Sequence, residues 1–240
     1  MTFPIQESRH RPKEATFAAL LRGLFPHTAS TRCCHSGHNV WIRKLDLSLM
    51  EIAKHLHDIA PTRWKNGKGT TRELFRIGAI DNEQDFALRV SVADMDCDSV
   101  FSTYPGVDRI LMILHGSGMQ LIDIPDSMVI ATLSGQFSTF SFAGERQLEG
   151  RLNDGPIIDL NVMIRRGFAT TGLRIIGPSQ TEPAGDCRLV LAARGELRVE
   201  SSDGNELALR DSEFITVTGA KRILTMSNSI AVLVDYHCSA

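Results

Sequence analysis

A run of ten residues in the first third of the chain gathers side chains that could bind a small molecule. Residues 64–73 read Trp-Lys-Asn-Gly-Lys-Gly-Thr-Thr-Arg-Glu. The guanidinium of Arg72 can fork onto a carboxylate in bidentate geometry, and glycines let the backbone approach a ligand closely. We therefore expect Arg72 to face an enclosed β pocket and to pair with a small organic acid, while Asn66, Thr71 and Ser91 fix its orientation.

Polar side chains also alternate along two later segments. Arg89 and Ser91 would share one face of a strand, and so would Asp159 and Asn161. A polar face is typical of a solvent-facing strand, but inside a barrel one face points toward the cavity. The candidate ligand-binding residues are Trp64, Lys65, Asn66, Thr71, Arg72, Glu73, Arg89, Ser91, Asp159 and Asn161. Trp64 would line the pocket or simply pack, and no residue is assigned a catalytic role.

Most catalytic signatures are absent from the sequence. The run from Asn66 to Thr71 is not a phosphate-binding loop, and Leu121 stands where a dinucleotide fingerprint would need its third glycine. His55 and His57 would share a strand face, but two ligands without a third are weak evidence for a metal. His115 is followed by Gly116 and Ser117 and so forms no His-x-His pair. We expect no catalytic metal and no cofactor.

The elements that must position these residues are short strands. Apolar and alternating runs predict strands over 73–80, 86–93, 109–115, 119–124, 128–133, 137–142, 157–164, 189–193, 196–200, 206–210, 214–217, 222–226 and 230–236. Gly116-Ser-Gly118 predicts a hairpin, and Asp203-Gly204 predicts another. Residues 52–59 fit a strand or a short helix. Residues 111–121 and 189–199 resemble each other loosely, which suggests a duplicated barrel with Gly144–Pro156 as a link.

Composition changes at Met50. Residues 1–49 hold five Arg and two Lys against three acidic residues, although the whole chain has a formal net charge of −2. We interpret 1–49 as a poorly ordered extension or a start-site artefact; a targeting peptide or a small metal-binding arm around Cys33-Cys34-His35 are the alternatives. The balanced charge and the short apolar runs argue against nucleic-acid and membrane partners. Scattered cysteines indicate reduced thiols in a cytoplasmic protein.

The sequence resembles the HutD/Ves family. The segment from Trp64 to Glu73 is similar to the W-K-N-G-G-G-x-T-R-E signature of that family. The resemblance continues through residues 88–93, 101–109, 114–118 and 159–166, so that it runs from about Met50 to the C-terminus. The matched positions include Asp108, Arg109 and Arg165. Two positions depart from the pattern: Lys68 replaces a glycine, and Leu88 replaces an aromatic residue, which would widen the pocket.

The resemblance implies an all-β bicupin, which means two small antiparallel β-barrels in residues 50–240. It implies a bacterial cytoplasmic protein that binds a small carboxylate resembling formylglutamate or urocanate and regulates histidine utilisation or a stress response. Metal-dependent cupins use a His-x-His pair that this chain lacks at His115, so we expect a metal-free protein. A homodimer is left open. The alternative is a cupin-type isomerase or hydrolase in which Glu73 or Asp159 is the general base. A third reading, a purely structural protein, predicts a filled barrel without a polar cavity.

Overall fold

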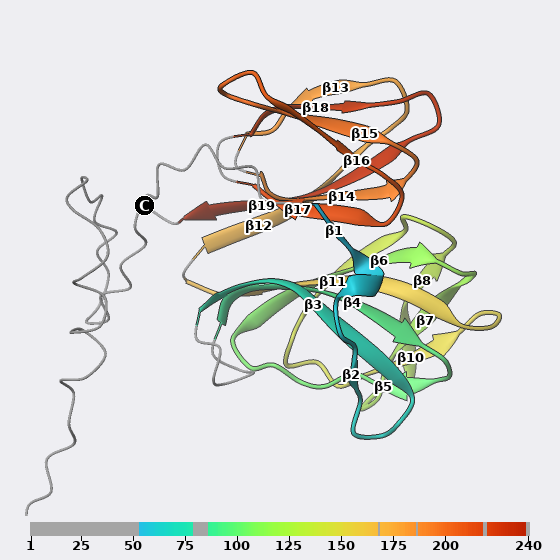
Figure 1. Cartoon of the computed structure of the whole chain (residues 1–240). Coiled ribbons are helices and arrows are strands. Elements are labelled where there is room, and N and C mark those ends of the chain that lie inside the picture. The colour runs from blue at the N-terminus through green and yellow to red at the C-terminus, as the bar shows by residue number, and fades with distance from the viewer. Residues whose placement is uncertain (1–52, 79–85, 168, 186, 218–219, 239–240) are drawn as a thin grey trace, which may run out of the picture. The chain divides into compact units, whose positions relative to one another are not determined.

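The computed structural model describes residues 53–78, 86–167, 169–185, 187–217 and 220–238 (Figure 1). All of these residues belong to one compact unit, Leu47–Ala240. Residues 1–49, including the Cys33-Cys34-His35 cluster, lie outside the described residues. Across the described residues, no helix has the length and apolar character needed to cross a membrane.

The described strands form four antiparallel sheets, two in each of two barrels. The N-terminal barrel combines a six-stranded sheet of order β2-β3-β4-β11-β6-β9 with a four-stranded sheet of order β5-β10-β7-β8. Its strands are β2 (Thr62–Arg63), β3 (Gly69–Gly78), β4 (Phe86–Met95), β5 (Ser99–Val100), β6 (Val107–His115), β7 (Gly118–Asp123), β8 (Met128–Ser134), β9 (Thr139–Ala143), β10 (Leu148–Leu152) and β11 (Ile157–Arg165).

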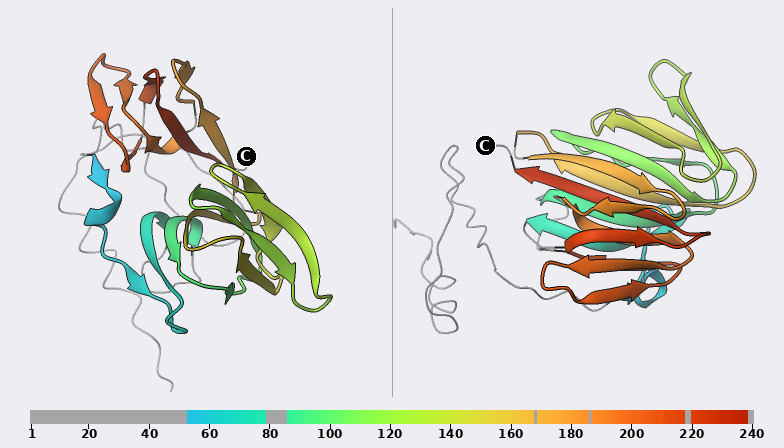
Figure 2. Two further views of the ribbon diagram at one scale, coloured as in Figure 1. Left: turned by 90° about the vertical axis from the view of Figure 1, so that its right-hand side faces the viewer. Right: turned by 90° about the horizontal axis from the view of Figure 1, so that it is seen from above.

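The C-terminal barrel has the same plan. A five-stranded sheet of order β1-β17-β14-β19-β12 faces a four-stranded sheet of order β13-β18-β15-β16. Its strands are β1 (Lys54–His55), β12 (Ala169–Ile176), β13 (Thr181–Pro183), β14 (Cys187–Arg194), β15 (Leu197–Ser201), β16 (Glu206–Leu209), β17 (Glu213–Thr216), β18 (Ala220–Thr225) and β19 (Ile230–Cys238). The left view of Figure 2 shows the orange and red strands of this barrel apart from the green strands of the N-terminal barrel.

The two barrels repeat one topology, as the loose sequence repeat suggested. The order β4-β11-β6-β9 in the first barrel corresponds strand for strand to β12-β19-β14-β17 in the second. The order β5-β10-β7-β8 corresponds in the same way to β13-β18-β15-β16. Strand β1 joins β17, so the described chain starts on the C-terminal barrel before it enters the N-terminal one. This duplicated all-β architecture confirms the predicted bicupin.

The hairpin predicted at Gly116-Ser-Gly118 is wrong. Strand β6 pairs with β9 and β11, whereas β7 pairs with β8 and β10, so the turn carries the chain from one sheet to the other. The turn at Arg194-Gly195 makes the same switch between β14 and β15. By contrast, β15 and β16 do pair around Asp203-Gly204, which confirms that hairpin.

Several other segments differ from the sequence-based expectation, and the strands β2, β5, β12 and β13 were not predicted. The 52–59 segment contains the two-residue strand β1 and a 3-10 helix, η1 (Leu56–Asp58), whose N-cap is His55. The expected link Gly144–Pro156 contains a central strand, β10, which pairs with both β5 and β7.

Apolar side chains gather in separate clusters inside and between the barrels. One cluster fills the C-terminal barrel, including Val190, Leu197 and Leu233. Another lies between the two sheets of the N-terminal barrel, including Leu111 and Met119. A third joins the large sheets of the two barrels through residues of β4, β6, β11, β14, β17 and β19. Both faces of the N-terminal large sheet are therefore covered, one by its own barrel interior and the other by its neighbour.

Candidate functional site

The inward face of the large N-terminal sheet carries a group of polar side chains. Register places Asn161 opposite Ser91 and Asp159 opposite Ala93, on the face that also holds the interior residue Met95. We define the interior polar cluster as Glu73 (β3), Arg89 and Ser91 (β4), Tyr104 in the β5–β6 connection, Arg109 (β6), and Asp159 and Asn161 (β11). Five of its members are candidate residues from the sequence, so the predicted sharing of strand faces is confirmed.

The centre of the cluster is a chain of two hydrogen bonds. Arg109 donates from Nη2 to Asn161 Oδ1 over 2.7 Å, and Asn161 donates from Nδ2 to Asp159 Oδ1 over 2.7 Å. All three side chains are buried, and Asp159 is 0% exposed. Two atoms of these three side chains, Arg109 Nε and Asp159 Oδ2, are buried without a hydrogen-bond partner among the described residues. Buried polar atoms in native proteins are nearly always paired, so both atoms lack a partner that the described residues do not supply.

Arg109 combines this polar contact with an aromatic surround. Its guanidinium carbon lies 4.9 Å from the ring centre of Phe142, 5.2 Å from Phe101 and 5.8 Å from Tyr104. Cation–π attraction stabilises this buried guanidinium, which has no hydration shell. Burial lowers the pKa of Arg109 to about 10, which leaves the side chain charged at neutral pH. The barrel therefore encloses a fixed positive charge.

In contrast to the charged Arg109, the buried carboxyl of Asp159 favours its neutral form. Burial raises the pKa of its carboxyl to about 7, although the hydrogen bond from Asn161 and the charge of Arg109 oppose the rise. The negative charge of Asp94 raises it further. A carboxyl that changes protonation near neutral pH can act as either a hydrogen-bond donor or an acceptor, and it can serve as a general acid or base.

Glu73 lies at the exposed rim of the cluster and is tied to two arginines. Arg89 Nε donates to Glu73 Oε2 over 2.7 Å, and Arg76 donates to both Glu73 oxygens over 2.8 and 2.7 Å. Burial would raise the pKa of Glu73, but the hydrogen bonds and charges of Arg76 and Arg89 outweigh it and lower the pKa. Glu73 is thus a stable anion that orients Arg89 and Arg76.

The expectation that Arg72 faces the barrel interior is wrong. Arg72 pairs in register with Val92 and forms an ion pair with Asp94, and Thr70 also donates to Asp94 over 2.9 Å. Val92 belongs to the core shared by the two barrels, so this face of the sheet is the outer one. Leu88 lies on the same outer face, so its departure from the family pattern does not widen the interior. The interior cations are Arg89 and Arg109.

The glycine-rich loop before β3 closes on its own barrel. Trp64 donates from Nε1 to Thr71 Oγ1 over 2.7 Å and packs against the interior cluster of apolar residues. Asn66 donates to Ser99 Oγ over 2.9 Å and accepts the backbone N–H of Lys68. Lys65 is exposed. Gly67, with φ of 72°, takes the left-handed position, so lysine at 68 meets no backbone conflict. These contacts give Trp64 and Asn66 structural roles in the loop.

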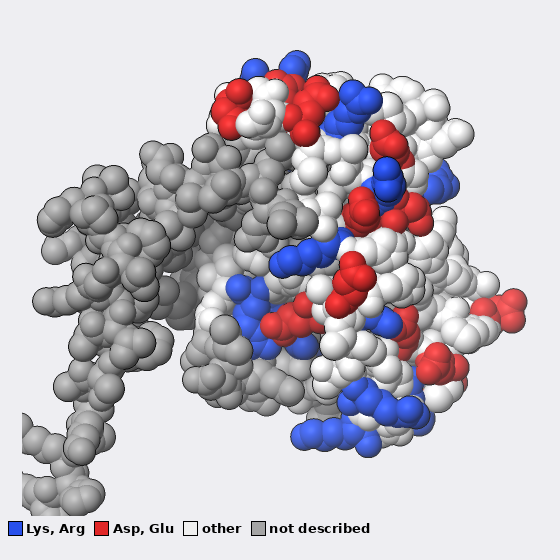
Figure 3. All heavy atoms as spheres, in the orientation of Figure 1, with Lys and Arg blue, Asp and Glu red and all other residues white. Residues whose placement is uncertain are grey.

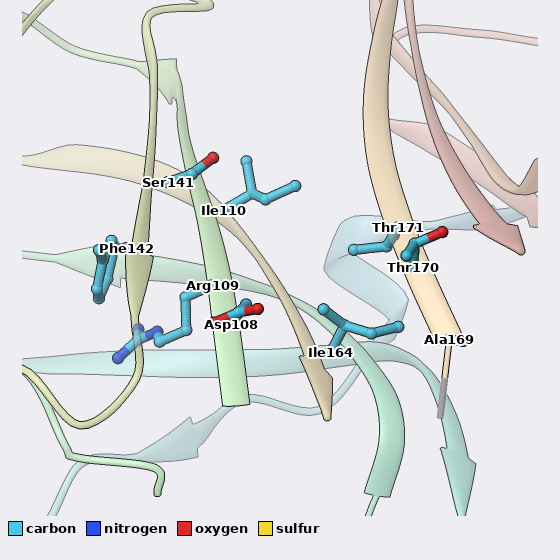
Figure 4. A pocket seen from close by; sticks show the side chains of 9 residues that line it. All are labelled: Asp108, Arg109, Ile110, Ser141, Phe142, Ile164, Ala169, Thr170 and Thr171. Atoms are coloured by element: carbon cyan, nitrogen blue, oxygen red, sulfur yellow. The ribbon is translucent and has the colours of Figure 1, made fainter. Parts of the chain in front are cut away.

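A separate pocket of about 420 Å³ lies where β11 leads into β12. Figure 4 shows Ile110 and Ile164 directed toward Thr171, whereas the Arg109 side chain is directed toward Phe142, away from β12. The pocket residues are Asp108, Arg109, Ile110, Ser141, Phe142, Ile164, Ala169, Thr170 and Thr171. Arg109 is the one member of the interior polar cluster that belongs to the lining of this pocket.

The other surfaces offer less chemistry. The C-terminal barrel is filled by aliphatic side chains, and its Arg174 and Asp235 pair with each other over 2.6 and 2.9 Å. Acidic and basic side chains are interspersed on the face in Figure 3, with basic ones gathered at its lower end. Within the described part of the chain, no three His, Cys, Asp or Glu side chains come together as metal ligands.

Sequence reasoning left Arg109 and Tyr104 out of the candidate list. Arg109 was matched only as part of the family pattern, because it begins an apolar strand and resembles a solvent-facing end residue. The available signal was its two-residue spacing from Leu111 and Ile113 (Ile113 is 0% exposed), which places all three on the inward face.

Comparison with known proteins identifies a family model and curated relatives that match this chain. The HutD family model matches residues 56–233. An uncharacterised 21.2 kDa protein in the hutC 3' region of Pseudomonas putida is 37% identical over 101 residues, which cover 42% of this chain and 50% of that protein. Protein Ves of Citrobacter koseri is 32% identical over 113 residues, covering 47% of this chain and 56% of that protein. The chain thus matches about half the length of these curated relatives.

Solved structures agree with the fold. A conserved protein of unknown function from Pseudomonas aeruginosa PAO1 superposes with a TM-score of 0.67 at 23% identity, covering 78% of this chain and 100% of that one. HutD from Pseudomonas fluorescens SBW25 superposes with a TM-score of 0.61 at 25% identity, covering 79% of this chain and 99% of that one. Since the family model spans most of the described residues and both barrels have the cupin plan, the chain belongs to the HutD family.

Proposed function

We propose that this protein binds a small carboxylate metabolite inside its N-terminal barrel and regulates histidine utilisation or a stress response through the bound state. One observation carries the proposal: the buried guanidinium of Arg109 keeps an N–H group that no described residue accepts. A buried, charged donor without an acceptor is costly, and a carboxylate would satisfy it with a charge-assisted hydrogen bond. Arg89, at 14% side-chain exposure, adds a second cation toward the rim.

The relatives favour the same class of ligand. The P. putida relative is encoded in the hutC 3' region, and the P. fluorescens HutD structure is described as a formate condition. Formate is the simplest carboxylate, and the ligands that we propose, such as formylglutamate and urocanate, are larger acids of the same class. We infer a cytoplasmic receptor that needs no metal and acts on pathway expression through a partner.

The proposal is tested by calorimetric titration with formylglutamate, urocanate and glutamate. We expect at least one acid to bind, and Arg109→Lys to weaken that binding by about tenfold or more, because an ammonium lacks the planar fork of a guanidinium. Arg222→Lys is the matched control, since Arg222 pairs with Glu200 on the C-terminal barrel. If none of the acids gives heat or a thermal shift with the folded protein, the proposal is wrong.

A second candidate function rests on Asp159. Its pKa of about 7 suits a general base or acid, whereas the lowered pKa of Glu73 makes that residue a poor base. We propose an isomerase or hydrolase reaction on the bound acid as the alternative. Turnover that disappears in Asp159→Asn while binding persists would favour the enzyme. Conversion that is unchanged in that variant would exclude Asp159 as the base.

A further inference from the structure

The interior polar cluster offers a ligand one unused donor and one unused acceptor. Arg109 Nε is the donor and Asp159 Oδ2 is the acceptor, and both are buried without a partner among the described side chains. Asn161 bridges the same two residues through its amide, accepting from Arg109 and donating to Asp159. The amide therefore fixes both groups relative to each other and leaves one free atom on each.

Charged and polar groups surround Asp159 from its own strand and from the strands packed beside it. Arg109 faces it from β6 and Asn161 from its own strand, β11, while Arg89 and Glu73 belong to the same inward cluster on β4 and β3. Asp94, on the outer face of β4, adds a negative charge. Only Asn161 donates a hydrogen bond to Asp159 among the described residues, so an ionised carboxylate here has one oxygen without a donor.

We propose that Asp159 Oδ2 accepts a hydrogen bond from an N–H or O–H group of the ligand, so that the site selects acids carrying such a donor over plain carboxylates. The inference rests on the proposed function and narrows its ligand class to amido, imidazole or hydroxy acids. Arg109 binds the carboxylate of the ligand, and Asp159 accepts the hydrogen bond from its N–H or O–H group. Sites that pair a buried acceptor with a ligand donor reject analogues that lack it, because the acceptor is left unpaired.

Two probes that differ in one substituent on the amide nitrogen test this selection. N-acetylglycine carries an amide N–H, and N-acetylsarcosine carries a methyl group in place of that hydrogen. At pH 8.5, where Asp159 is largely ionised, we expect N-acetylglycine to bind at least about tenfold more tightly by calorimetry. Equal affinity of the two probes for the unchanged protein would overturn the inference.

Asp159→Asn separates hydrogen bonding from the bulk of the methyl group. Asparagine has the same shape, can still accept from Asn161, and replaces the free oxygen by an N–H donor. We expect the affinity ratio of the two probes to fall to within about threefold of unity in this variant. The exposed Asp126→Asn should keep the ratio of the unchanged protein. A ratio that persists in Asp159→Asn would show that the methyl group acts by bulk alone, which contradicts the inference.

The unchanged protein gives a second readout that needs no variant. At pH 5.5 Asp159 is protonated and turns its hydroxyl into a donor, so the ratio should again fall toward unity. A ratio that is the same at pH 5.5 and 8.5 would also contradict the inference. Absence of binding of both probes, beside binding of formylglutamate, urocanate or glutamate, would overturn the inference and leave the proposed function standing. Absence of binding of all five acids would overturn the proposed function.

Discussion

The carboxyl of Asp159 makes the stability of the fold depend on pH. Burial raises its pKa from 3.8 to about 7, so between these values the folded protein holds a proton that the unfolded chain releases. The free energy of unfolding therefore falls as pH rises through this window, because the folded protein must either keep the Asp159 proton or bury a charged carboxylate. Between pH 4 and 8, we expect the free energy of unfolding of the unchanged protein to fall by on the order of 4 kcal/mol relative to that of Asp159→Asn.

Urea denaturation of both proteins across that pH range measures the difference. Asp126→Asn, at an exposed turn position, is the control and should differ from the unchanged protein by a constant amount. A constant difference for Asp159→Asn as well would mean that the folded protein does not hold the Asp159 proton more tightly than the unfolded chain.

Side-chain placement in the site was predictable only where one face of a strand is distinct. The polar alternation of β11 set Asp159 and Asn161 apart from the aliphatic residues between them, and the register confirms their common face. Strand β3 gave no such contrast, because both faces of the sheet are covered and Arg72 has a carboxylate partner on the outer one. The register shift between Glu73 and Phe75 also breaks the simple alternation along β3. Arg72 was therefore placed on the wrong face.

At the level of single elements, the turn between β6 and β7 depends on glycine at 118. Gly118 has φ of 92°, and a Cβ there would lie 1.9 Å from the carbonyl oxygen of Leu133. Neither the backbone angle nor the neighbouring strand β8 tolerates a side chain. We expect Gly118→Ala to cost more than about 3 kcal/mol of unfolding free energy, or to prevent folding.

Gly135→Ala separates the two causes. Gly135 has a similar φ of 78°, but a Cβ at this position would meet no described atom within 4 Å. Strain of the backbone angle alone should cost about 1 kcal/mol. Chemical denaturation compares the two variants, and equal losses would show that the contact with Leu133 does not matter.

Most long strands were predictable from apolar periodicity, but the eight-residue strand β12 and the short strands β2, β5 and β13 were not, and neither was strand pairing. The glycine turn at 116–118 resembles a hairpin in sequence, yet it switches sheets, because the residues of β6 and β7 bury their apolar faces in opposite walls of one barrel. Strand β10 was missed because glycine occupies its inward position 150, where a Cβ would crowd Met119 and Phe101 at 3.0 Å. Packing against distant strands decided both features, and local sequence does not report it.

At the scale of the whole molecule, the two barrels share one core. Leu88 and Leu160 of the N-terminal barrel belong to the same buried cluster as Leu191 and Val232 of the C-terminal barrel. Neither large sheet could expose this face to water without a large loss of hydrophobic free energy. The duplicated fold is therefore expected to unfold as one unit, even though only one barrel holds the interior polar cluster.

Leu191→Ala tests this cooperativity across the junction. The side chain is 1% exposed on β14, so truncation should cost about 2–5 kcal/mol. Because Trp64 belongs to the N-terminal barrel, a Trp41→Phe background makes Trp64 fluorescence a reporter of that barrel alone. We expect the urea midpoint from Trp64 to fall as far as the midpoint from circular dichroism, since loss of the second barrel uncovers the sheet of the first. An unchanged Trp64 midpoint beside a lowered circular-dichroism midpoint would show that the barrels unfold independently.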